Sequence, residues 1–297
     1  MQTVGDHSSE VGHPNPPCTV NHVDQPAPTR TGRRPPPPWI EVRIARREVL
    51  GEHMVGLTLH GEGLASMEAP GPAASIRLLV PGADADGSAG DAPAPLVLPA
   101  WNGNEFLLPD GRRPVIRTFT PLRFDAGAAT LDVEVVRHPG GAVSGWAERC
   151  EVGAHAAVSG PGRGFEVDPG AASWLLLGDE AAMPAIGQVL AAIGDTVPTD
   201  VVVEVGSAAA QRHLATTDST RVCHLRRDRD GRPGDSLVEH VRSLERVDPG
   251  THVWAAGEAA AMQAIRKELR GRLSVARDHM TVRGYWKLGT TPPRLGA

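Results

Sequence analysis

The chain has 297 residues, a formal net charge of −5 and a pI of about 6.2. A nucleic-acid-binding protein would be expected to present a basic face, so this charge argues against nucleic acid as a partner. Hydrophobic residues make up 40% of the chain, which is enough to build folded cores and excludes wholesale disorder. No apolar run approaches the roughly 18 residues of a membrane span, so we expect no membrane insertion.

The N-terminal stretch lacks the basic region and the apolar core of a secretory signal. The three cysteines, Cys18, Cys150 and Cys223, lie far apart in the chain. This cysteine usage fits a reducing compartment, and we expect a cytoplasmic protein. Neither the cysteines nor the 12 histidines follow a metal-ligand spacing, so the sequence predicts no metal site of its own.

Residues 1–38 are predicted to form a disordered, proline-rich tail. Nine of the 27 prolines fall there, with few apolar residues between them. Such a segment cannot bury enough surface to offset the entropy of ordering it, and the run Pro35–Pro38 should adopt stiff polyproline II. Both a partner-binding role for this run and a passive extension are compatible with the sequence.

Residues 39–170 are predicted to form an antiparallel β-barrel. Apolar and polar residues alternate there in short runs bounded by Gly, Pro or Asp, as in half-buried strands. Six or seven such runs without long helices between them are typical of a six-stranded barrel or of a sandwich. The predicted strands are 39–44, 54–59, 75–80, 96–98, 115–120, 131–136 and 154–159. We expect one short helix at 143–150 and an exposed loop at 82–95.

Residues 171–297 are predicted to form a parallel-sheet α/β domain. Continuous apolar runs there read as strands covered on both faces, and they alternate with segments of helical spacing. The predicted order is strand 173–177, helix 183–193, strand 200–205, strand 251–255, helix 259–273 and strand 281–288. Alternating strands and helices indicate a parallel sheet, so the fold class is a β-barrel followed by an α/β domain, with the boundary near Gly170.

The stretch Arg117-Thr118-Phe119-Thr120 lies on a predicted barrel strand and is the first candidate binding segment. By strand alternation Arg117 and Phe119 point to the same side. A guanidinium makes two charge-assisted bonds to a pyrophosphate or a ribityl oxygen, and an aromatic ring can lie against an isoalloxazine. Thr120 precedes a proline, where its hydroxyl or backbone N–H could meet the flavin N5. The alternative is an ordinary strand with one solvated arginine.

The second candidate segment runs from His138 to Ala147 and opens the short predicted helix. Gly141 and the glycine before it let the backbone approach a ligand, and a helix N-terminus offers free N–H groups to a phosphate. Those groups belong to Ala142, Val143 and Ser144. The Ser144 hydroxyl could bind phosphate or simply cap the helix, and His138 could be a ligand contact or a structural histidine.

Taken together, these segments resemble motifs of the siderophore-interacting protein family, flavin-dependent ferric-siderophore reductases related to the ferredoxin reductases. The family motifs are R-T-Y-T, H-G-x-G-P-A-S-x-W-A, G-D-E-T-A-L-P-A-I, W-x-A-G-E and G-Y-W-R. Their counterparts stand in the same order here, at 117–120, 138–147, 178–186, 254–258 and 284–287. No single motif is decisive, but five in order are specific, and the resemblance covers residues 39–289.

This chain departs from the family motifs at several positions. Phe119 replaces a tyrosine, which keeps the ring but loses a hydroxyl, and Ala142 replaces a proline. Ala181 replaces a threonine, which puts a side-chain contact there in doubt. Leu122 interrupts an arginine pair and leaves Arg123.

The resemblance implies an FAD-binding barrel followed by an NAD(P)H-binding domain. It places Asp179, Glu180 and Glu258 beside the nicotinamide, at the ends of parallel strands where such sheets bind ligands. The alternative for Asp179 is a helix cap. The turn after strand 200–205 offers no acid for ribose hydroxyls, and Ser207 with Arg212 favours the 2′-phosphate of NADPH over NADH. A solvated arginine is the alternative there.

Lys287, Arg283 and Arg123 could form a cationic rim that attracts an anionic ferric siderophore, although surface cations often have no such role. Tyr285 and Trp286 are expected to be core residues. The expected function is FAD-dependent reduction of a ferric siderophore to release Fe(II), with electrons from NADPH, NADH or ferredoxin and no acid–base catalytic residue. The rivals are a flavin or ferredoxin-type reductase that serves an oxygenase, and a non-catalytic siderophore-binding protein.

Overall fold

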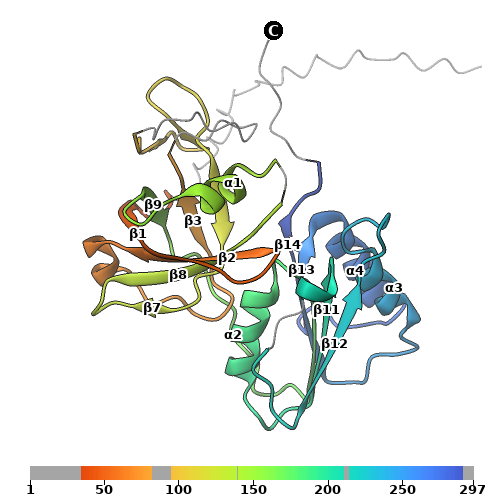
Figure 1. Cartoon of the computed structure of the whole chain (residues 1–297). Helices are drawn as coiled ribbons and strands as arrows, with labels where there is room; N and C mark the ends of the chain where they lie inside the picture. Colours follow the sequence, from red (N-terminus) through yellow and green to blue (C-terminus); the bar gives the residue numbers. More distant parts are fainter. Residues whose placement is uncertain (1–34, 82–94, 139, 211–213, 290–297) are drawn as a thin grey trace, which may run out of the picture. The chain divides into compact units, whose positions relative to one another are not determined.

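The structure is a computed structural model that describes residues 35–81, 95–138, 140–210 and 214–289 (Figure 1). The predicted tail and the predicted loop 82–95 fall almost wholly outside these ranges and stay predictions. Within them the chain forms a seven-stranded antiparallel sheet, a five-stranded parallel sheet and a two-stranded hairpin. Gly170, the predicted boundary, lies between the last antiparallel and the first parallel strand. None of the described helices has the length and apolar character needed to cross a membrane.

The antiparallel sheet has the strand order β6-β3-β9-β1-β2-β8-β7. Its strands are β1 (Trp39–Val49), β2 (Met54–His60), β3 (Ile76–Leu79), β6 (Ile116–Phe119), β7 (Phe124–Asp125), β8 (Thr130–Val136) and β9 (His155–Ser159). Edge strand β6 also contacts β8, the neighbour of the opposite edge. The sheet therefore curls into a barrel, as predicted, with β7 as an additional short strand.

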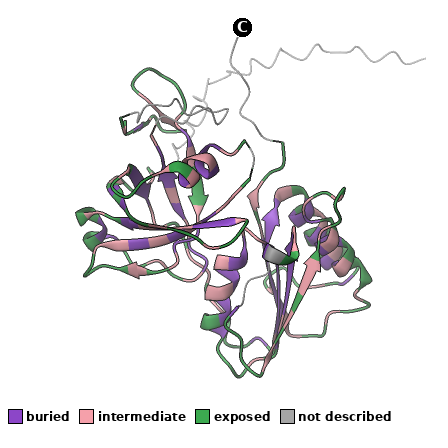
Figure 2. Ribbon diagram, viewed as in Figure 1, coloured by how far each residue is buried: buried purple, intermediate pink, exposed green. Residues whose placement is uncertain are grey.

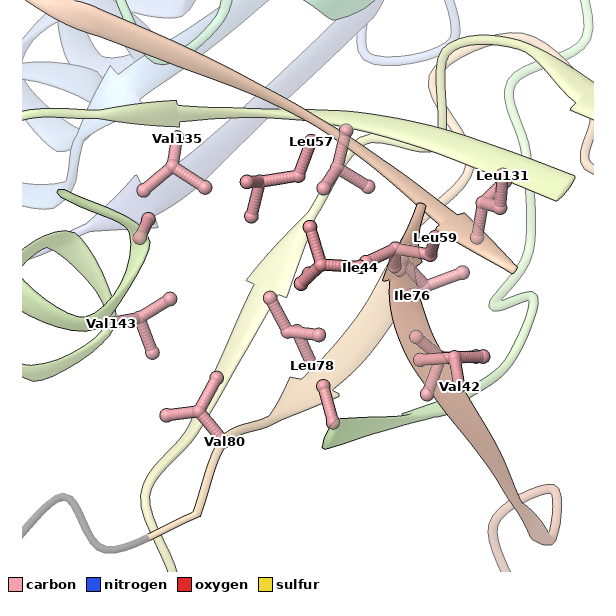
Figure 3. Packing of buried hydrophobic residues seen from close by; sticks show 14 of the residues in the cluster. Val42, Ile44, Leu57, Leu59, Ile76, Leu78, Val80, Leu131, Val135 and Val143 are labelled. Carbon is pink, nitrogen blue, oxygen red and sulfur yellow. The ribbon is translucent and has the colours of Figure 1, made fainter. Parts of the chain in front are cut away.

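Alternating side chains of these strands fill the barrel (Figure 3). Val42 and Ile44 of β1 and Leu57 and Leu59 of β2 are at most 2% exposed, and burying each such side chain contributes about 1.5–3 kcal/mol. The 3₁₀ helix η1 (Glu62–Ser66) and helix α1 (Ala142–Arg149) complete this part. The α1 residues Ala142, Val143 and Ala147 belong to the same core, so the barrel holds the start of this helix in place.

The parallel sheet has the strand order β12-β11-β10-β13-β14. Its strands are β10 (Ser173–Asp179), β11 (Thr199–Val205), β12 (Thr220–Arg226), β13 (Thr251–Glu258) and β14 (Met280–Trp286). Its helices are α2 (Met183–Ile193), the 3₁₀ helix η2 (Ala208–Ala210), α3 (Asp235–Ser243) and α4 (Ala259–Gly271). All five strands are parallel. Along the chain, β11 and β12 are added on one side of β10, and β13 and β14 are added on its other side. The strand order therefore reverses between β10 and β13. Ligands of such sheets bind at this reversal, beyond the carboxyl ends of the strands.

Helices cover both faces of the parallel sheet, which explains its continuous apolar strands (Figure 2). On one face α2 packs against Leu176 and Trp254, and on the other α3 and α4 pack against Leu177 and Val253. This confirms the predicted α/β architecture.

One predicted element was wrong, and two elements were not predicted. Residues 96–98 form no strand, and Val97 and Leu98 are 42% and 38% exposed. Apolar composition alone does not make a strand where no neighbour supplies hydrogen bonds; the nearby hairpin pairs β4 (Ala100–Trp101) with β5 (Phe106–Leu107) instead. Strand β12 and helix α3 were missed, because β12 is a half-exposed edge strand without an apolar run and α3 buries only three side chains.

Replacing Gly234 by alanine should destabilise the protein strongly. Gly234 has φ +89°, and an added Cβ would lie 2.2 Å from the Cβ of Ala261 on α4. We expect the free energy of unfolding in urea to fall by about 3 kcal/mol, of which about 1 kcal/mol is backbone strain. Gly153→Ala is the matched control, since Gly153 has φ +90° with no atom within 4 Å of the added Cβ. Equal losses in the two variants would contradict a tight approach of α3 and α4.

Candidate functional site

Strand β6 carries the first predicted binding segment and lies at an edge of the barrel sheet. Among the described strands β3 is its one hydrogen-bonded neighbour, so no described strand uses the backbone groups on its other side in a ladder. Arg117 is exposed, and its guanidinium donates to the carbonyl of Ile116 at 2.9 Å. Phe119 is half-buried and packs against the barrel core. The edge therefore offers a cation, part of an aromatic ring and open backbone groups.

The second predicted segment forms a tight turn into α1. Gly140 has φ +74°, and a Cβ on Gly141 would lie 2.3 Å from the His138 ring. The Ser144 hydroxyl is buried and accepts from the His138 backbone N–H at 2.9 Å. Ser144 thus ties the turn to the helix, and the His138 ring occupies the space that the glycine leaves.

The start of α1 provides backbone donors. The bond from Gly145 N–H to the Gly141 carbonyl, 2.7 Å, is the first i→i−4 bond of the helix. The amides of Ala142, Val143 and Ser144 precede it and point out of the helix N-terminus, where the helix dipole favours an anion.

These two segments fit one flavin dinucleotide. Both β6 and α1 contact β8, so the barrel brings them to a common neighbour. A helix N-terminus and a guanidinium suit a pyrophosphate, and an open strand edge with an aromatic side chain suits the ribityl chain and the ring. The space beside Gly141 is taken by the His138 ring, but a Cβ on Gly140 would meet no described atom within 4 Å, so the backbone of the turn is open to approach there.

The end of β6 is held by side chains from the parallel-sheet half. Thr120 is buried and lies near the Tyr285 phenol on β14. The Gln188 amide on α2 donates to the Pro121 carbonyl at 2.6 Å and accepts from the Ala73 backbone N–H at 3.0 Å. Burial raises the pKa of Tyr285. Sequence reasoning treated Tyr285 as core and missed Gln188, whose partners lie 67 and 115 residues away.

Asp179 lies at the carboxyl end of β10, beside the strand-order reversal, and is 5% exposed. Its Oδ1 accepts from the Ala181 backbone N–H at 3.0 Å, so the replacement of threonine by alanine there keeps a backbone contact. Its Oδ2 accepts from the Glu258 backbone N–H at 3.0 Å and from the Trp286 indole N–H at 2.7 Å. Asp179 therefore joins the ends of β10, β13 and β14.

Burial raises the pKa of Asp179 from 3.8 to about 6. The hydrogen bonds from Trp286, Ala181 and Glu258 oppose this shift, and the negative charge of Glu204 adds to it. The desolvation cost is the larger effect, as expected for a carboxyl group inside a fold.

Glu258 caps helix α4. Its Oε2 accepts from the backbone N–H groups of Ala260 and Ala261 at 2.6 and 3.0 Å, and its Oε1 accepts from that of Leu288 at 3.2 Å. Burial raises its pKa, but these backbone bonds outweigh burial and the net shift is downward. Glu180 accepts from the Gly206 backbone N–H at 2.6 Å. All three predicted carboxylates thus bind backbone of this chain, and their contact with a nicotinamide stays a prediction.

The end of β11 differs from the expectation that it offers no acid. Glu204 stands one residue before the strand end, but it is 1% exposed and accepts from the backbone N–H groups of Gly234 and Ser236 at 2.7 and 3.0 Å. Its carboxylate faces the start of α3, and the Arg227 guanidinium lies 3.8 Å from its Oε1. In the following turn the Ser207 hydroxyl lies 3.0 Å from the His53 Nε2. Arg212, the predicted partner of Ser207, lies outside the described residues.

The predicted cationic rim falls into two parts. Arg123 forms an ion pair with Asp132 on β8, with 3.1 Å between Nε and Oδ2, and lines a groove on the outer face of the barrel. Arg283 belongs to β14. Lys287 is the first residue after the end of β14, and it is exposed. Arg283 and Lys287 therefore lie four residues apart at the end of β14, whereas Arg123 belongs to the barrel.

The free energy of unfolding should depend on pH through the titration of Asp179. Because its folded-state pKa lies above its unfolded value, ionised Asp179 costs stability above pH 6, and this cost is relieved as pH falls to about 4. The free energy of unfolding of the natural protein should therefore rise relative to Asp179→Asn by about 2–3 kcal/mol between pH 7 and pH 4. Urea unfolding of both proteins at each pH measures the difference.

Asp179→Asn also removes one acceptor atom, which lowers the free energy of unfolding by the same amount at every pH. This loss cancels when the difference between the two proteins is compared at pH 7 and pH 4. Asp230→Asn, at an exposed position, is the control for surface titration. A difference between the natural protein and Asp179→Asn that does not change with pH would contradict the assignment.

Comparison with known proteins assigns both halves of the chain. Residues 43–165 match the family described as Siderophore-interacting FAD-binding domain, and residues 171–289 match Siderophore-interacting protein. An uncharacterized protein of Mycobacterium tuberculosis is 32% identical over 82% of this chain and 88% of its own length. The ferric vibriobactin reductase ViuB of Vibrio cholerae is 26% identical over 83% of this chain and 88% of its own.

A solved structure of a siderophore utilization protein from T. fusca superimposes with a TM-score of 0.73. It is 27% identical and covers 87% of this chain and 96% of its own. With family matches over both sheets and a relative at 32% identity over most of both chains, the protein belongs to the siderophore-interacting protein family.

Proposed function

We propose that this protein is an FAD-dependent reductase that takes electrons from a reduced nicotinamide and delivers them to a ferric siderophore, with release of Fe(II). One observation carries the proposal: the hydrogen bond from the Gln188 amide on α2 to the Pro121 carbonyl, 2.6 Å, joins the end of the flavin-type strand edge to the helix that follows β10, where the strand order reverses. A flavin and a nicotinamide must meet for hydride transfer, and this contact links the two expected binding regions. The family and the reductase ViuB support the same activity.

In this proposal FAD is held by β6 and the turn into α1. Arg117 neutralises negative charge of the dinucleotide, Phe119 lies against the ring and Thr120 offers its backbone N–H. The amides of Ala142, Val143 and Ser144 bind the pyrophosphate, with His138 and Gly141 shaping the turn. The Phe119 ring retains the stacking surface that the family tyrosine would provide.

When bound, FAD would supply hydride acceptance from the nicotinamide and single-electron delivery to two Fe(III) centres. The chain supplies position and electrostatics. Asp179, Glu180 and Glu258 shape the nicotinamide side at the ends of β10 and β13. Since these carboxylates accept hydrogen bonds from the chain's own backbone, we assign no acid–base role to them.

The substrate enters our proposal as an anionic complex of Fe(III). Lys287, Arg283 and Arg123 attract it by charge, and it needs only to approach the flavin edge. Hard oxygen ligands hold Fe(III) far more tightly than Fe(II), so reduction weakens the complex and releases the metal.

The purified protein should be yellow and should reduce an anionic tris-catecholate complex of Fe(III) in the presence of NADPH or NADH. Fe(II) trapped by ferrozine measures the product.

Arg117→Ala should weaken FAD binding by about ten- to a hundredfold, because a charge-assisted contact to the dinucleotide is lost. Arg113→Ala, which removes an exposed arginine paired with Glu105 shortly before β6, should leave FAD affinity unchanged.

A colourless protein that takes up no FAD would contradict the proposal. A yellow protein that reduces ferredoxin or cytochrome but not the ferric complex would favour a reductase serving an oxygenase. Tight binding of the ferric complex without any nicotinamide oxidation would favour a siderophore-binding protein. Stopped-flow mixing measures the rate of FAD reduction by NADPH, NADH and reduced ferredoxin in turn, and so identifies the donor.

For the donor we propose NADPH. An acid at the end of the second parallel strand commonly binds the ribose hydroxyls of NADH, but Glu204 is buried and accepts hydrogen bonds from the backbone at the start of α3. The adjacent turn offers the Ser207 hydroxyl and the His53 imidazole instead. The Arg227 side chain follows β12 and would lie 2.9 Å from a Cβ on Gly206. Hydroxyl and cationic groups suit a 2′-phosphate.

The protein should therefore bind 2′,5′-ADP more tightly than 5′-AMP, by on the order of tenfold. Calorimetric titration measures this preference independently of turnover. His53→Gln should reduce the preference, whereas His60→Gln, at an exposed position on the same strand pair, should not. Equal affinity for the two nucleotides would contradict the NADPH proposal and leave the FAD-dependent activity untouched.

A further inference from the structure

The segment that follows β14 is anchored on both sides of Lys287. On one side the Trp286 indole N–H donates to Asp179 at 2.7 Å, and on the other the Leu288 backbone N–H donates to Glu258 at 3.2 Å. Lys287 itself is exposed between these two anchors. Its position therefore depends on two buried carboxylates from other strands.

The two carboxylates are themselves fixed. Asp179 and Glu258 are each 5% exposed, and the Glu258 backbone N–H donates to Asp179 at 3.0 Å. Gly257 allows this approach, because a Cβ there would lie 2.7 Å from the Asp179 Oδ2. Glu258 also caps α4 through Ala260 and Ala261. The anchors are thus part of the rigid end of the sheet.

Stability alone does not require this arrangement. A buried carboxylate is costly, and Asp179 is held beside a second acid, Glu204. The Leu288 side chain is 47% exposed, so its anchor holds backbone in place without burying an apolar group. The effect of these hydrogen bonds is to fix the geometry of residues 286–288.

We propose that Asp179 and Glu258 act as positioning residues that hold Lys287, through Trp286 and Leu288, where it meets the anionic ferric complex. This inference rests on the proposed function and assigns the anchored segment to the substrate side of the site. An ordered cation binds an anion better than one on a loose segment, because less entropy is lost on binding.

The first test is Trp286→Phe, which keeps an aromatic ring but removes the indole donor. We expect the Kd and the KM for the tris-catecholate complex of Fe(III) to rise about threefold to tenfold. Trp174→Phe is the matched control: Trp174 lies at the opposite end of β10, and its buried indole nitrogen has no hydrogen-bond partner among the described residues. It should change thermal stability without changing either constant.

The decisive measurement combines variants. If Trp286 acts through Lys287, then Trp286→Phe should change the Kd by less than about twofold in a protein that already carries Lys287→Ala. If Trp286→Phe raises the Kd by the same factor with and without Lys287→Ala, the two residues act independently and the inference is overturned. An unchanged Kd in Trp286→Phe alone would also overturn it. A natural protein that does not reduce or bind the ferric complex would instead count against the proposed function.

A second pair of variants tests the other anchor without touching the buried end of the sheet. Leu288→Pro removes the backbone N–H that donates to Glu258, whereas Leu288→Ala keeps it. We expect a rise of about threefold or more in the Kd for Leu288→Pro and none for Leu288→Ala. Equal values in these two variants would show that the anchor does not position Lys287.

Discussion

The hydrogen bonds of buried Asp179 are the constraint on which the site depends. Its oxygens bind the Ala181 and Glu258 backbone N–H groups and the Trp286 indole, so one carboxylate joins the carboxyl ends of three parallel strands. Burial disfavours its charge enough to raise its pKa to about 6. The fold accepts this cost at the place where strand order reverses and where α/β sheets bind ligands.

Small residues around Asp179 follow from the same constraint. A Cβ on Gly178 would lie 2.6 Å from the Cβ of Ala182, and one on Gly257 would lie 2.7 Å from the Asp179 carboxylate. Gly257 is thus required by close packing against the acid, and Gly178 by the close packing of α2 and β13 on β10. The motif residues are therefore explained by geometry within the chain, before any ligand is considered.

Sequence predicted the parts of this fold that have local signals. Strand β10 is a continuous apolar run, and α2 has clear helical spacing, so both were found within a few residues. Strand β12 was missed because an edge strand needs no apolar run, and residues 96–98 were wrongly predicted as a strand because composition carries no information about a pairing partner. The sequence also could not show that Glu204 faces α3, since its partners Gly234 and Ser236 lie on a helix that was itself missed.

The same limit applies to the contacts that link the two sheets. His53 meets Ser207 across 154 residues, Gln188 meets Pro121 across 67, and Thr120 meets Tyr285. None of these pairs belongs to a periodic pattern, yet together they hold the strand edge with Arg117 and Phe119 against the parallel sheet. An electron-transfer protein needs distance and orientation more than it needs acids and bases. It is consistent with this need that Asp179, Glu180 and Glu258 are used to hold backbone, while our proposal assigns charge recognition to basic side chains such as Arg117 on β6 and Arg283 on β14.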